Sequence, residues 1–141
     1  MNAQPVWWIA GFSLAAVLIV HYWVLWGASR LAPPNAVNRH GVAMLLVLSL
    51  AAAHVVYITA YALLSAGVIA WSPEAGLDGG APTPANLFTV SAMAFTTLGF
   101  SAVTPAGPLR IVTAAAGLAG FMTLTWSATF VYSAFKATWE R

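Results

Sequence analysis

Residues 83–100 read TPANLFTVSAMAFTTLGF, and this stretch decides the fold of the chain. Thr83 followed by Pro84 has the form of a helix N-cap with proline at the first helical position. The apolar helix that we expect over residues 84–97 is too short to cross a bilayer, because a spanning helix needs about 20 residues. Apolar segments of this length are more often buried or re-entrant. The sequence therefore predicts a half-length helix at this place rather than a span.

Apolar runs long enough to span a bilayer lie on both sides of this segment, at residues 41–71 and from 108 to about 134. A third run, residues 6–26, precedes them. A cleaved signal peptide is the alternative for this first run, but the run is too long for that and no Lys or Arg precedes it. Aromatic residues mark its two ends, as they do at membrane interfaces: Trp7, Trp8, Tyr22, Trp23 and Trp26. We predict three transmembrane helices.

The composition agrees with a chain that lies in lipid. Of the 141 residues, 61% are hydrophobic and only 6% are charged, whereas a soluble domain carries about 25% charged residues. The sequence has no cysteine, which excludes disulfides and thiolate metal sites. The net charge of +2 is small and the basic residues are scattered, so nothing indicates a nucleic-acid partner.

Charges next to the runs predict the orientation, because Lys and Arg favour the cytoplasmic side. The 29–40 loop holds two Arg and no acid, and residues 72–84 hold two acids and no base. Arg110 is the exception, near the outer end of the third span. We predict the following division: a first transmembrane helix over 1–28 with its N-terminus outside, a cytoplasmic loop over 29–40, a second helix over 41–71, an extracellular loop and re-entrant unit over 72–107, and a last helix with a short cytoplasmic tail over 108–141.

The re-entrant unit begins and ends on the same side, so its backbone must dip into the membrane and return. Non-helical backbone is tolerated at that depth only against protein or water. The C-terminal end of the short helix carries a partial negative charge, which favours a cation. The backbone that follows can offer carbonyls in place of the water shell of an ion. The sequence thus indicates a cavity or pore for a cation.

Residues 91–100, SAMAFTTLGF, resemble the pore helix and filter of potassium channels, whose filter is usually written T-T-V-G-Y-G-D. Residues 103–105 and 107–110 resemble the turn into the inner helix of the two-span bacterial channels. The resemblance covers about 41–134 and leaves the first span as an addition. It implies an all-α integral membrane protein with three transmembrane helices, plus a re-entrant pore helix and filter loop between the second and third. It also implies a bacterial or archaeal cytoplasmic membrane.

The resemblance further implies a role for each residue of the filter. K⁺, the permeant ion, would be held by the backbone carbonyls of Thr97, Leu98, Gly99 and Phe100, with no other cofactor. Four chains are needed to complete each ring of carbonyls, so a homotetramer is expected. The whole expected selectivity filter comprises Thr96, Thr97, Leu98, Gly99, Phe100 and Ser101.

The chain departs from the family pattern in the outer half of the filter. Leu98 replaces Val and Phe100 replaces Tyr, which are mild changes. Ser101 stands where the family has a glycine in the left-handed conformation, which costs a residue with a Cβ roughly 1 to 2 kcal/mol. Ala102 replaces the Asp that braces the filter. Two alternatives therefore stay open: a non-conducting accessory subunit with a channel-like fold, in a larger membrane complex, and a poorly selective cation channel.

In the last run, Gly120, Thr123 and Ser127 share one helical face. Gly120 follows Thr97 by 23 residues, close to where the family has a hinge glycine in its inner helix. We expect a hinge or the lining of a wet cavity below the filter. The alternative is helix packing, since small residues let membrane helices approach closely.

His21 and His54 lie inside predicted spans, and ionisable residues there merit a functional hypothesis. Axial ligation of a haem is one hypothesis. Counting residues from the inner ends of the spans puts the two side chains at heights that differ by roughly 9 Å, which favours a neutral helix-to-helix hydrogen bond instead. The sequence shows no nucleophile, paired carboxylates or metal-ligand cluster, so we do not expect an enzyme.

Overall fold

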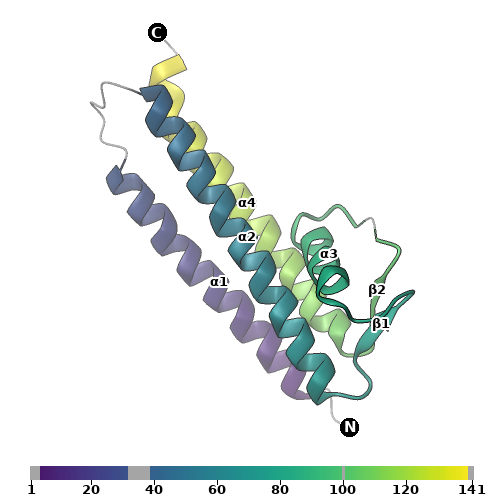
Figure 1. Ribbon diagram of the computed structural model, residues 1–141. Helices are drawn as coiled ribbons and strands as arrows, with labels where there is room; N and C mark the ends of the chain where they lie inside the picture. Colours follow the sequence, from purple (N-terminus) through teal and green to yellow (C-terminus); the bar gives the residue numbers. More distant parts are fainter. Residues whose placement is uncertain (1–3, 32–38, 100, 140–141) are drawn as a thin grey trace.

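The computed structural model describes residues 4–31, 39–99 and 101–139. Three long helices lie side by side, and a short helix with two short strands packs on one side of them (Figure 1). In chain order the elements are α1 (Gln4–Leu31), α2 (Arg39–Trp71), β1 (Gly76–Asp78), α3 (Pro84–Phe95), β2 (Thr104–Ala106) and α4 (Leu109–Trp139). The predicted arrangement of three spans with a short helix between the second and third is confirmed.

The three long helices have the length and composition of membrane spans. Their apolar stretches run over Pro5–Arg30, His40–Trp71 and Leu109–Lys136, which are 26, 32 and 28 residues long. Each exceeds the roughly 20 residues that a spanning helix needs. Large apolar side chains such as Phe12, which is 74% exposed, cover the outside of the bundle. The chain is an integral membrane protein, since lipid is the solvent that such a surface requires.

The long helices extend further than the apolar runs suggested. α1 continues to Leu31, three residues into the expected 29–40 loop, and α2 already begins at Arg39. α4 continues to Trp139, into the expected tail. Polar residues do not end these helices, because a helix that leaves the hydrocarbon core is still stabilised by its own backbone hydrogen bonds.

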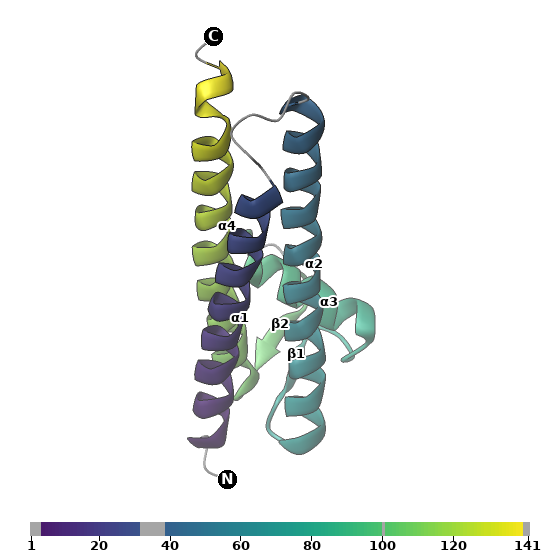
Figure 2. The same cartoon turned by 90° about the vertical axis from the view of Figure 1, so that its left-hand side faces the viewer.

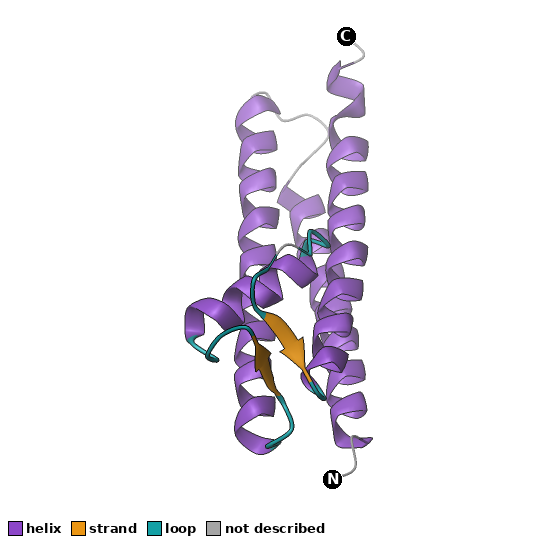
Figure 3. Ribbon diagram, turned by 90° about the vertical axis from the view of Figure 1, so that its right-hand side faces the viewer, coloured by secondary structure: helices purple, strands orange, loops and turns teal. Residues whose placement is uncertain are grey.

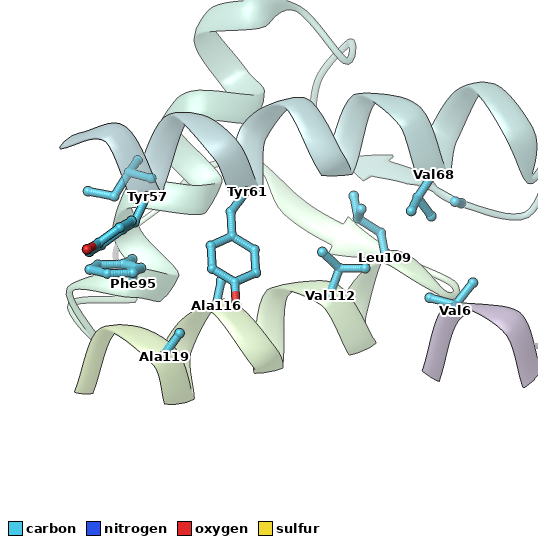
Figure 4. Close-up of a cluster of buried hydrophobic side chains, with 11 residues drawn as sticks. Val6, Tyr57, Tyr61, Val68, Phe95, Leu109, Val112, Ala116 and Ala119 are labelled. Atoms are coloured by element: carbon cyan, nitrogen blue, oxygen red, sulfur yellow. The ribbon is translucent and has the colours of Figure 1, made fainter. Parts of the chain in front are cut away.

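Helix α4 is the centre of the packing. Its buried side chains Leu109, Val112, Ala116 and Ala119 recur at helical spacing and face α2, α1 and the end of α3. Figure 4 shows them meeting Tyr57, Tyr61 and Val68 of α2, Val6 of α1 and Phe95 of α3. Figure 2 shows α1 in front of the pair formed by α2 and α4, and α3 lies behind that pair.

Two short strands join the two ends of the re-entrant unit. β1 and β2 pair antiparallel, with Leu77 opposite Pro105 (Figure 3). Pro105 fits there because a two-stranded ribbon has only edge strands, where a missing N–H is tolerated. We expected only an exposed loop over 72–84, so β1 is a correction. The pairing joins the chain that enters the α3 segment to the chain that leaves it.

The C-terminal end of α3 rests directly on the backbone of α4. A Cβ added to Gly120 would overlap the carbonyl oxygen of Phe95, so only glycine permits this contact. Gly120 lies 11 residues after Leu109, the first residue of α4, which corresponds to a depth of about 16 Å along the helix. That is roughly half of a hydrocarbon core about 30 Å thick. The short helix therefore ends near the middle of the bundle, as a re-entrant helix must.

Replacing Gly120 by alanine should displace α3 from α4. We expect Gly120→Ala to lower stability by about 1 to 3 kcal/mol or more, the usual cost of overpacking, because the contact is with backbone that cannot rotate away. Gly67→Ala is the matched control, since an added Cβ at this helical glycine meets nothing within 4 Å. Thermal unfolding of the purified protein in detergent compares the two. Equal melting temperatures for the two variants would contradict the close contact.

The sequence has no native cysteine, so the orientation predicted from charge can be tested with single cysteines introduced by mutation. Ala81, between β1 and α3, and Ala134, near the far end of α4, are both exposed. We expect a cysteine at Ala81 to react with an impermeant thiol reagent added outside the cell, and a cysteine at Ala134 to react only after permeabilisation. The opposite pattern would reverse the orientation and the direction from which α3 enters the membrane.

Candidate functional site

The start of α3 is fixed by a side-chain cap. Thr83 has extended backbone angles, and its hydroxyl accepts a hydrogen bond from the Asn86 amide at 3.2 Å. Pro84 occupies the first turn, where its missing N–H costs nothing. The Asn86 side chain donates to the Ala81 carbonyl at 2.8 Å and ties the cap to the preceding loop. The N-cap expected from the sequence is confirmed.

The end of α3 comes earlier than expected, at Phe95 rather than at residue 97. Thr96 caps the helix, and both its amide (2.9 Å) and its hydroxyl (2.7 Å) donate to the Ala92 carbonyl. Thr97 then takes a positive φ of 59°, the left-handed conformation that commonly ends a helix. It is the one non-glycine residue with a positive φ in the described part of the chain. A left-handed threonine cannot continue a helix, which is why the helix stops.

The backbone after Thr96 alternates in handedness. Thr97 (φ 59°) and Gly99 (φ 71°) are left-handed, and Leu98 between them is not. The amides of Thr97 and Gly99 both turn back to α3, donating to Ala94 O at 3.0 Å and to Met93 O at 3.3 Å. In a trans peptide the carbonyl of the preceding residue points the opposite way from the amide. The carbonyls of Thr96 and Leu98 therefore point away from α3.

These carbonyls belong to an open segment. Thr97, Leu98 and Gly99 are exposed in the single chain, and the apolar side chain of Leu98 is 59% exposed. Four of the expected filter residues, Thr96 to Gly99, directly follow α3, and Ser101 begins the next described segment. The sixth, Phe100, lies outside the described residues. Because φ of Ser101 depends on Phe100, the left-handed conformation expected for Ser101 stays a prediction.

The turn that follows the filter segment is supported by backbone contacts. The Ser101 hydroxyl accepts a hydrogen bond from the Val103 amide at 3.1 Å. Ala102 approaches Gly79 so closely that a Cβ added to Gly79 would lie 2.5 Å from the Ala102 carbonyl oxygen. Gly79 itself has a positive φ of 84°. The backbone at Ala102 is therefore held by contact with the loop before α3, without a side-chain brace of its own.

The inner-helix residues face the interior of the chain. Thr123 is fully buried, and its hydroxyl donates to the Ala119 carbonyl at 2.9 Å. The Ser127 hydroxyl lies 3.2 Å from Nε2 of His21 on α1. Gly120, Thr123 and Ser127 are all buried in the single chain, and Ser127 also lines a groove between α2 and α4. Their expected place in the lining of a cavity below the filter stays a prediction. A hinge at Gly120 stays a prediction. The open face of α4 carries Phe121, Thr125 and Thr129 instead.

The two intramembrane histidines lie next to one another. Their ring centroids are 5.5 Å apart, which corrects the height difference of roughly 9 Å estimated from the sequence. That estimate assumed spans of equal depth, whereas α1 and α2 are staggered and reach beyond their apolar runs. His21 makes the expected helix-to-helix hydrogen bond, to Ser127. The described residues contain no group of three or more metal-ligating side chains.

Sequence reasoning missed the environment of these histidines. Tyr57 lies beside both rings, and Trp126 stacks on His21 with centroids 6.2 Å apart and planes inclined by 14°. The spacing of His54 and Tyr57, three residues apart on one helix, placed them on one face. Nothing in the sequence showed which face of α1 or α4 would meet them.

Comparisons with family models, with curated proteins and with solved structures gave no significant match to this chain.

Proposed function

We propose that the chain is a subunit of a tetrameric pore that conducts cations, most favourably K⁺, through the segment Thr96–Gly99. One observation carries the proposal: α3 ends near the middle of the bundle against Gly120, and the next residues turn carbonyls away from the helix. Carbonyls at membrane depth need hydrogen-bond donors, water or a cation. Carbonyls that point away from protein in an exposed segment suit water or a cation.

Electrostatics favours a cation at this place. The C-terminal end of α3 carries roughly half a negative charge, directed at the segment Thr96–Gly99. The sequence has three acidic residues. Of the two described ones, Glu74 lies just before β1 and Asp78 is the last residue of β1. They are therefore not placed to hold the ion by side-chain coordination. In this proposal the ion is held by backbone carbonyls and by the helix dipole.

The need for several copies follows from the geometry of one chain. A single segment offers carbonyls from one side only, whereas an ion in a filter is surrounded. The exposed Leu98 side chain is also apolar surface at membrane depth that a neighbouring subunit can cover. α1 and α3 lie on opposite sides of the pair formed by α2 and α4 (Figures 1 and 3). Four copies can therefore gather around the α3 side and leave α1 at the lipid-facing rim.

A non-conducting accessory subunit is the second candidate, and Ala102 favours it. Its side chain has no hydrogen-bonding group, so the outer half of the filter depends on backbone contacts at Gly79 and on the Ser101 hydroxyl. A filter supported in this way has fewer bonds that resist collapse. The same feature would suit a poorly selective channel.

Gly99 provides the sharpest test of conduction. Its φ of 71° strains any residue with a Cβ, yet an added Cβ meets nothing within 4 Å, so the fold should survive. We expect Gly99→Ala to reduce Rb⁺ and K⁺ flux in liposomes at least tenfold, about 1.4 kcal/mol or more, without loss of the tetramer. Gly76→Ala is the matched control, because Gly76 has no positive φ and an added Cβ there also meets nothing within 4 Å.

Flux and oligomer size, measured on the same preparations, separate the candidates. A tetramer that carries Rb⁺ and loses this flux with Gly99→Ala supports the pore. A wild-type protein that is monomeric, or that carries no K⁺, Na⁺ or Rb⁺, contradicts conduction and favours the accessory subunit. Flux that is equal for K⁺ and Na⁺ favours the poorly selective channel.

A further inference from the structure

A polar cluster lies in the apolar interior, where α1, α2 and α4 meet. His21 is fully buried, with Nε2 at 3.2 Å from the Ser127 hydroxyl and Nδ1 at 3.4 Å from the Tyr57 hydroxyl. Both hydroxyls can either donate or accept a hydrogen bond. His21 is therefore satisfied on both sides whether its ring is neutral or protonated.

His54, the neighbour of His21, is not satisfied. Its Nδ1 lies 2.6 Å from the carbonyl oxygen of Leu50. A carbonyl only accepts, so Nδ1 carries the proton, and Nε2 of the neutral ring is a bare lone pair. His54 is 9% exposed, and Nε2 is the buried side-chain nitrogen or oxygen that lacks a hydrogen-bond partner within the described ranges. A buried acceptor without a partner is destabilising, so a ligand that pairs with Nε2 would be favoured there.

The ligand can arrive through a groove between α2 and α4. This groove has a volume of about 480 Å³, and His54 and Ser127 contribute polar groups to its lining at one end, with Tyr132 further along α4. The rest of the lining is apolar. The volume is ample for several water molecules, each of which needs roughly 30 Å³. His54 belongs to the lining, so water that enters the groove lies beside the imidazole ring.

We propose that His54 is a proton-binding site, loaded through this groove, and that the pore helix α3 senses its charge. The ligand is a hydrated proton: a hydronium ion transfers H⁺ to the Nε2 lone pair, which leaves water and an imidazolium with one positive charge. A metal ion suits the site less well, because the described chain offers no third metal-ligating side chain beside the two histidines.

The surroundings limit the cluster to one proton. The groups that face His54 are His21 from α1, Tyr57 from α2, Phe95 from α3 and Ser127 from α4. Neither these groups nor the residues that line the groove include a carboxylate, Lys or Arg. Two imidazolium rings with centroids 5.5 Å apart in an apolar interior would repel strongly. Each chain should therefore take up a single proton.

The charge is placed to act on the pore helix. The His54 ring lies edge-on to Phe95, the last residue of α3, with centroids 5.9 Å apart and planes at 69°. An imidazolium there opposes the negative end of α3, the same field that favours a cation at Thr96–Gly99. Acid should therefore weaken cation binding and reduce flux. This coupling rests on the proposed pore, whereas proton binding at His54 does not.

Proton binding is tested by NMR of the full chain in detergent micelles with ¹⁵N-labelled histidine, titrated from about pH 8 to about pH 4. At high pH we expect one resonance pair with the Nδ1–H tautomer, lost in His54→Gln and retained in His40→Gln, and we expect it to convert to imidazolium on acidification. If His54→Gln does not assemble, spectra of His21→Gln and His40→Gln assign His54 by elimination. A His54 ring that stays neutral throughout overturns the proposal.

Coupling is tested by Rb⁺ flux in liposomes over the same pH range. We expect a several-fold fall in flux on acidification for wild type and for His40→Gln, and no fall for His54→Gln. A conducting protein in which His54 takes up a proton but flux does not change overturns the coupling. A wild type that binds the proton but conducts at no pH overturns the pore and supports the proton site.

Discussion

The contact between Gly120 of α4 and the carbonyl end of α3 is the constraint on which the rest of the structure depends. It sets how deep α3 enters, because Phe95 can rest on α4 only where α4 has no side chain. The neighbouring Gly117 shows how local the requirement is, since a Cβ there would lie at 3.4 Å from the Ala94 carbonyl, near ordinary van der Waals contact. Depth in turn decides which backbone groups must find partners away from bulk water.

In the re-entrant unit, hydrogen bonds at both ends satisfy most of these backbone groups. On the inner side, the amides of Thr97 and Gly99 are satisfied by carbonyls of α3 itself. At the end away from Gly120, the pairing of β1 with β2 satisfies backbone groups that would otherwise belong to loops. Between these two anchors a few carbonyls are left, and they point away from the helix. The site is polar because these carbonyls stay unpaired within the described part of the chain, while the backbone on both sides of them is hydrogen-bonded.

The sequence predicted the parts of this arrangement that depend on local or one-dimensional signals. Run lengths gave the three spans and the half-length helix, and Thr83 with Pro84 gave the start of α3. The end of α3 at Phe95 was not predictable, because it depends on the left-handed angle of Thr97. β1 has only three residues, too few for a recognisable pattern. The adjacency of His21 and His54, and the burial of Thr123, depend on the stagger and rotation of whole helices, which no local signal contains.

Helix α1 is bound to the molecule unevenly, and this has a mechanical consequence. It packs more extensively on α4 than on α2, and the bond from His21 to Ser127 and the stacking on Trp126 both join it to α4. Any tilt of α4 must therefore sweep α1 sideways through the surrounding acyl chains. Work done against lateral pressure in the bilayer then contributes to the energy of that tilt, so the position of α4 depends on the thickness and tension of the membrane.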